Sequence, residues 1–142
     1  DSLFQYYGGF RNTHSEPAAE HGGAIFRLRQ RPDGFMSADA AYEGGEFTTP
    51  RLRFSGRTLV LNVDGSALGT AQVALLDAAG HEIPGFGLAE CEEIGGNALE
   101  RVVRWKGTSD LSALAGKEVR LKFAMRAMKL FSFRFPSGDD GQ

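Results

Sequence analysis

Hydrophobic and polar residues alternate along several short stretches of the chain. In the clearest one, residues 119–126, Val119, Leu121, Phe123 and Met125 occupy every second position, and basic or small residues lie between them. Side chains of a β-strand point alternately to opposite faces, so a period of two is typical of a strand and not of a helix. The stretch therefore predicts a strand with one buried face.

Further short strands are predicted in the same way, each bounded by residues that favour turns, such as Gly, Pro, Asp and Asn. With the stretch above they cover residues 3–10, 25–29, 35–38, 46–49, 59–64, 71–77, 99–105, 119–126 and 130–135. Residues 109–116 begin with Ser-Asp and end with Gly, which predicts a short helical turn. We therefore expect an all-β fold, a two-sheet antiparallel β-sandwich of jelly-roll-like form with at most one short helical turn.

The length of 142 residues predicts one main hydrophobic core. Residues 11–23 are polar and poor in bulky apolar groups, which is typical of a loop or linker. We therefore expect an N-terminal strand and linker over residues 1–23, a sandwich over residues 24–136 and a disordered polar tail over residues 137–142.

Charge and hydrophobic patterning argue against two classes of partner, nucleic acids and membranes. The net charge is −2, and the sixteen basic and eighteen acidic residues are spread along the chain. A nucleic-acid partner is not expected, because its binding needs clustered basic residues. A membrane partner is not expected either, because no stretch reaches the roughly 18 apolar residues that cross a bilayer.

Cys91 is the only cysteine, so neither an internal disulfide nor a multi-cysteine metal site can form. We expect it to be a small buried hydrophobic residue. The cysteine count leaves the compartment open, and the first residues, Asp1 to Phe4, lack the basic and apolar segments of a signal peptide.

No catalytic residue is predicted. Glycoside hydrolysis usually needs two carboxyl groups about 5 to 10 Å apart, whereas the acidic residues here lie mostly in turn-like stretches where solvated carboxylates are normal. The three histidines, His14, His21 and His81, have no spacing typical of a metal or catalytic site. No serine lies in a strand-turn-helix nucleophile motif.

Aromatic residues give the candidates for ligand binding, because sugar sites stack aromatic rings on the apolar faces of sugars. Tyr6 and Tyr7 are candidate platforms, with Arg11 and His14 as polar contacts. The alternative for this aromatic strand is contact with a neighbouring domain. Trp105, the single tryptophan, is a further candidate, although its strand neighbours favour a place in the core.

No cofactor is expected, with a structural Ca²⁺ as the one exception that the residues allow. Calcium prefers carboxylate and carbonyl oxygens, and β-sandwich modules often hold it in loops. Asp39, Glu43 and Glu46 lie near a Gly-rich turn and are the candidate ligands.

Several segments form a combination that is more specific than any one of them. They are Leu28-Arg29 with Arg31-Pro32-Asp33-Gly34-Phe35 and Ser37, Phe47-Thr48-Thr49, Phe54-Ser55-Gly56, residues 59–64, residues 73–80 with Ile83-Pro84-Gly85-Phe86, Val103-Arg104-Trp105-Lys106-Gly107, residues 110–117 and residues 119–123. Together they resemble the C-terminal β-sandwich module of bacterial proteins related to the β-propeller glycoside hydrolases.

This resemblance implies a non-catalytic accessory module, which packs against the catalytic domain, binds polysaccharide weakly, or does both. Residues 3–9 then resemble the last propeller strand, and the expected partners are the catalytic β-propeller domain and a polysaccharide. The parent protein would be secreted or periplasmic. The alternative is a small stand-alone polysaccharide hydrolase or lyase on a jelly-roll scaffold, which needs a cleft lined by ionisable groups with perturbed pKa values.

Overall fold

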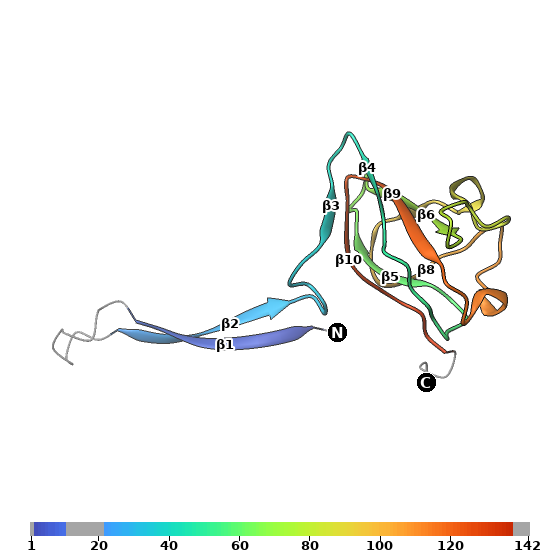
Figure 1. The fold of residues 1–142 in the computed structure, drawn as a ribbon. Helices are drawn as coiled ribbons and strands as arrows, with labels where there is room; N and C mark the ends of the chain where they lie inside the picture. The colour runs from blue at the N-terminus through green and yellow to red at the C-terminus, as the bar shows by residue number, and fades with distance from the viewer. Residues whose placement is uncertain (1, 11–21, 138–142) are drawn as a thin grey trace. The chain divides into compact units, whose positions relative to one another are not determined.

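The computed structural model describes residues 2–10 and 22–137 and contains two compact units, residues 1–34 and 35–142. The first unit is a β-hairpin of β1 (Leu3–Phe10) and β2 (Gly23–Gln30), which run side by side in Figure 1. Their antiparallel register runs from Leu3 opposite Gln30 to Phe10 opposite Gly23. We expected the boundary after residue 23, whereas this division falls after residue 34, because β2 pairs with β1 along its whole length.

The second unit is the expected β-sandwich of two antiparallel sheets (Figure 1). The first sheet has the order β3-β10-β5-β8 and the second the order β4-β9-β6-β7. The strands are β3 (Ala38–Ala40), β4 (Gly45–Thr48), β5 (Val60–Asp64), β6 (Thr70–Leu76), β7 (Ile94–Gly95), β8 (Asn97–Val102), β9 (Arg120–Arg126) and β10 (Met128–Arg134).

Most connections in the sandwich carry the chain from one sheet to the other. Strands β3 and β4 belong to different sheets, as do β5 and β6, β7 and β8, and β9 and β10. The last of these crossings takes place at one residue, Ala127, whose φ of 47° turns the chain sharply. Each sheet is therefore assembled from segments that are distant in sequence.

The core lies between the two sheets and is filled by the alternate residues that the sequence pattern identified. Leu121 and Phe123 of β9 and Leu61 and Val63 of β5 have no exposed surface. Phe47 stacks on Phe123 with ring centroids 4.9 Å apart. Each such buried side chain contributes about 1.5–3 kcal/mol to the hydrophobic stabilisation of the fold.

Two 3₁₀ turns complete the second unit. The turn η3 (Ser112–Leu114) lies inside the stretch where a helical turn was predicted, and η2 (Leu88–Glu90) is an additional one. The strand expected over residues 99–105 ends at Val102, and Trp105 forms only isolated bridges, with Cys91 and Thr108. The expected tail falls, from residue 138 onward, outside the described residues.

Candidate functional site

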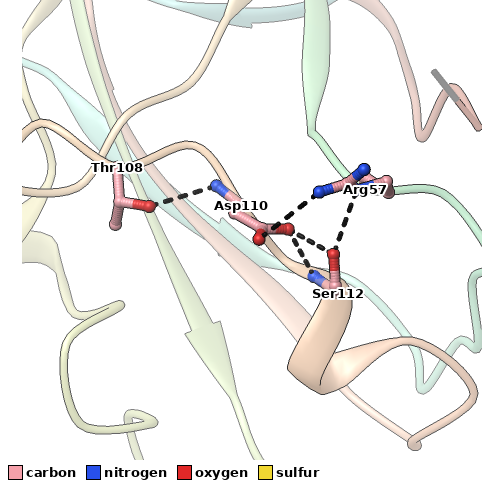
Figure 2. Close-up of polar contacts among 4 residues, drawn as sticks. All are labelled: Arg57, Thr108, Asp110 and Ser112. Carbon is pink, nitrogen blue, oxygen red and sulfur yellow. Dashed lines mark hydrogen bonds and ion pairs between the residues drawn. The ribbon is translucent and has the colours of Figure 1, made fainter.

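Asp110, just before η3, contacts three other polar residues, Arg57, Thr108 and Ser112 (Figure 2). The Asp110 carboxylate accepts hydrogen bonds from the backbone N–H of Ser112, at 3.0 Å, and from the Ser112 hydroxyl. The Arg57 guanidinium lies 3.7 Å from the other carboxylate oxygen, and its Nε donates to Ser112 Oγ at 3.2 Å. The Asp110 N–H donates to Thr108 Oγ1 at 3.2 Å.

These contacts fix the backbone conformation at the beginning of η3. The hydrogen bond from the Ser112 hydroxyl is the main cause that holds the pKa of Asp110 below its usual range, with the Ser112 N–H as the second. A carboxylate with a lowered pKa is a weak base, and no other base contacts Ser112 within this cluster. The arrangement is that of an Asx turn at the beginning of a short 3₁₀ turn, not of an activated nucleophile.

Trp105 lies in the core. Its side chain has no exposed surface, and its Nε1–H donates a 2.8 Å hydrogen bond to the Val73 carbonyl. Phe86 contacts the indole edge to face, with centroids 5.5 Å apart. This corrects the expectation that Trp105 could stack on a sugar, because no face of its ring is open to a ligand.

The structure does not bring the three candidate calcium ligands together. The Asp39 carboxylate lies 2.8 Å from Lys129 Nζ, and the Glu46 carboxylate lies 2.8 Å from Lys122 Nζ. These two carboxylates therefore each have a cationic partner. Within residues 2–10 and 22–137, no group of three or more His, Cys, Asp or Glu side chains is placed to hold a metal ion. Glu43 and Glu46 do line one shared surface hollow, which Asp39 does not.

Tyr6 and Tyr7 lie on β1 with 66% and 56% of their surface exposed. Because neighbouring residues of a strand face opposite sides, the two tyrosines belong to different faces of the hairpin. The other two residues of this candidate set, Arg11 and His14, lie outside the described residues.

The register divides the hairpin into two faces of different character. The uncharged face carries Leu3, Gln5, Tyr7, Phe26, Leu28 and Gln30, and the basic face carries Phe4, Tyr6, Phe10, Ile25, Arg27 and Arg29. On the uncharged face Tyr7 stacks on Phe26 with centroids 5.3 Å apart. On the basic face the Arg27 guanidinium lies 5.1 Å from the centroid of Phe4.

A second surface feature lies on the outer side of the sheet β4-β9-β6-β7. The outward positions of β9 are Arg120, Lys122, Ala124 and Arg126, so one small residue interrupts a row of long cationic ones. Ala124 lies opposite Glu46 of β4 on one side and opposite Gln72 of β6 on the other. The short side chain leaves an open hollow of about 470 Å³ at this point.

Tyr42 contacts Arg126, one of the residues that line this hollow. The Arg126 guanidinium lies 4.0 Å from the centroid of the Tyr42 ring, and Arg126 Nε donates a 2.9 Å hydrogen bond to the Tyr42 carbonyl. Tyr42 has 62% of its surface exposed and is not itself among the residues that line the hollow. We did not expect this site from the sequence; the only signal available was the alanine within the row of basic residues on β9.

No protein family, curated protein or solved structure matches the chain. None of the helical turns in the described part of the chain is long and apolar enough to cross a membrane.

Proposed function

We propose that this chain is a non-catalytic accessory module of a carbohydrate-active protein, and that its hairpin packs against the catalytic β-propeller domain of that protein. The observation that carries the proposal is the uncharged face of the hairpin. Leu3, Tyr7, Phe26 and Leu28 on this face are each more than 40% exposed, on a ladder of only two strands.

A hairpin of two strands is at best marginally stable in water, because it buries little apolar surface. Covering one face with a second sheet would bury four large side chains, each worth about 1.5–3 kcal/mol when fully buried. A neutral, aromatic face fits another β-sheet well, since two sheets pack through interdigitating apolar side chains. A domain built from sheets, such as a propeller, supplies that surface.

The charges on the two faces of the hairpin indicate which face packs on the partner. Arg27 and Arg29 lie on the basic face, where Arg29 Nε donates to Ser2 Oγ at 2.8 Å and Arg27 lies over Phe4. Burying these guanidinium groups without carboxylate partners would be costly. The uncharged face therefore packs on the partner, and the basic face stays in contact with water.

The test compares substitutions on the two faces of the hairpin. Tyr7→Ser with Leu28→Ser removes apolar surface from the uncharged face, and Tyr6→Ser with Arg27→Ser is the matched control at the neighbouring ladder positions. We expect the first pair to weaken association of the 142-residue chain with the separately produced catalytic domain at least about tenfold, measured by isothermal titration calorimetry. Equal affinity for both variants and the wild type would contradict the packing.

Catalysis by the chain itself is tested separately. Incubation of the purified chain with several polysaccharides should release no new reducing ends. Release that is abolished by one carboxylate substitution would overturn the accessory role in favour of a small hydrolase, and release of unsaturated ends would favour a lyase.

A further inference from the structure

The basic face of the hairpin carries two exposed arginines and no acidic residue. Arg27 and Arg29 occupy alternate positions of β2, so their Cα atoms lie about 6.6 Å apart on the same side of the ladder. Neither residues 2–10 nor residues 22–30 contain an Asp or a Glu. This face is therefore a local concentration of positive charge in a chain whose net charge is −2.

Both guanidinium groups are oriented by a neighbour while they remain exposed. Arg29 Nε donates a 2.8 Å hydrogen bond to Ser2 Oγ, and the Arg27 guanidinium lies 5.1 Å from the centroid of the Phe4 ring. A guanidinium carries five N–H donors in one plane, and a contact with a ring uses its flat face and not these donors. Both arginines therefore keep N–H donors for an acceptor on another molecule.

A carboxylate is the acceptor that fits such a group, because its two oxygens match the planar fork of a guanidinium. A single exposed ion pair contributes little binding free energy, so a small free acid would bind too weakly to be retained. A polymer with a carboxylate on each unit differs in this respect. Once Arg27 binds one carboxylate, the contact at Arg29 forms within the same complex and the two contacts reinforce each other.

The surface beside the arginines suits a chain of sugars better than a nucleic acid. Tyr6 lies directly opposite Arg27 in the register, with 66% of its surface exposed, and Ile25 on the same face is 82% exposed. These side chains offer apolar contact to the C–H groups of a sugar. Double-stranded DNA carries about one charge per 1.7 Å, and its binding needs more basic residues than the two on this face.

We propose that the basic face of the hairpin binds an acidic polysaccharide, a chain of uronic acid units whose carboxylates pair with Arg27 and Arg29. The proposal names the ligand class of the accessory module. It rests on the proposed function, because packing through the uncharged face leaves the basic face accessible.

Fluorescence anisotropy of a labelled oligogalacturonate, titrated with the whole chain, tests the proposal. We expect saturable binding that weakens at least about tenfold between about 0.01 M and about 1 M ionic strength, because the screening length falls from about 30 Å to about 3 Å. Unlabelled oligogalacturonate should displace the probe. A neutral β-glucan oligosaccharide of the same length should not, because it has no carboxylate for the arginines.

Three double variants show which groups are responsible. Arg27→Gln with Arg29→Gln removes both charges and should weaken binding at least about tenfold. Arg27→Lys with Arg29→Lys keeps the charges but loses the planar fork, so it should weaken binding by a smaller factor. Arg104→Gln with Lys117→Gln is the matched control, since it removes two exposed charges from the sandwich and gives the same net charge, and it should bind as the wild type does.

The Hα signals of Gly9 in an NMR spectrum verify that the hairpin is formed in each variant, because the Phe26 ring lies against Gly9 and shifts them. A glutamine variant that keeps these shifts and loses binding supports the proposal. A glutamine variant with wild-type affinity contradicts it.

Four further results would also overturn the acidic-sugar site: no saturable binding by the wild type, an equal loss in the sandwich control, displacement by the neutral oligosaccharide, or displacement by an oligonucleotide of equal charge as effective as that by oligogalacturonate. The last result would indicate a surface for polyanions in general. None of these results changes the calorimetry of Tyr7→Ser with Leu28→Ser, so a failure of this proposal is distinguishable from a failure of the packing.

Discussion

At the scale of single residues, the sandwich depends on a few places where backbones approach so closely that a side chain has no space. The loop between β5 and β6 is one of these. Gly69 donates its N–H to the Gly65 carbonyl at 2.6 Å, and a Cβ added to Gly69 would lie 2.3 Å from Gly65 Cα and 2.4 Å from the Ala127 oxygen. All of these neighbours are backbone atoms, which cannot rotate away.

We therefore expect Gly69→Ala to lower the free energy of unfolding by about 3 kcal/mol, as overpacked sites do. Gly45→Ala is the matched control, because no atom lies within 4 Å of its added Cβ. The control should change stability by less than about 1 kcal/mol. Urea unfolding followed by Trp105 fluorescence measures both variants, and equal stability of the two would show that the loop can relax.

At the scale of elements, the short edge strand β3 is joined to β10 by an ion pair as well as by backbone pairing. Lys129 lies opposite Asp39 in the register, with Nζ 2.8 Å from the carboxylate. The hydrogen bond from Lys129 is the main cause that lowers the pKa of Asp39, and the Ser37 hydroxyl adds to it. The same pair raises the pKa of Lys129.

A lowered folded-state pKa means that Asp39 stabilises the fold fully above its unfolded pKa, about 3.9, and loses this contribution as the pH falls through the folded value. We therefore expect the stability difference between wild type and Asp39→Asn to be constant above about pH 5 and to shrink below about pH 4. Lys129→Gln should reproduce the effect, and the two substitutions together should add little. A difference that stays constant down to pH 2 would show that Asp39 gains nothing from Lys129.

The elements themselves were largely predictable, whereas their partners were not. The alternation in residues 119–126 predicts β9 almost residue for residue, because one face of that strand is buried and the other is not. The same kind of signal in residues 25–29 says nothing about which strand lies alongside, and β2 pairs with β1 across a segment that reads only as a linker.

The candidate sites, too, could be predicted only in part from the sequence. Trp105 was a candidate for sugar binding, but its strand neighbours favoured the core, where it lies with no exposed surface. Tyr42 and Arg126 are 84 residues apart, and only the strand register places them together. The order of the strands in the sheet determines which side chains line a surface hollow. The local alternation of residues does not predict that order.

At the scale of the whole molecule, we expect the repeated crossings between the sheets to make the sandwich unfold as a single cooperative unit. Cys91 lies inside this unit, where Val73 N–H donates to its sulfur at 3.2 Å. Burial raises the pKa of its thiol, and the thiolate is the form that reacts with disulfide reagents. Both the burial and the raised pKa should therefore protect it in the folded state.

We expect Cys91 in the native protein to react with a disulfide reagent at pH 8 at least about a thousandfold more slowly than in urea, because labelling requires the sandwich to open. An exposed thiol, introduced as Ala79→Cys together with Cys91→Ala, should react at once and gives the intrinsic rate. If the sandwich opens as one unit, Gly69→Ala should speed the labelling of Cys91 by the factor that its loss of stability predicts, although the two residues belong to different loops. Labelling that is slow but insensitive to Gly69→Ala would place Cys91 in a region that opens separately, and the sandwich would then consist of more than one cooperative unit.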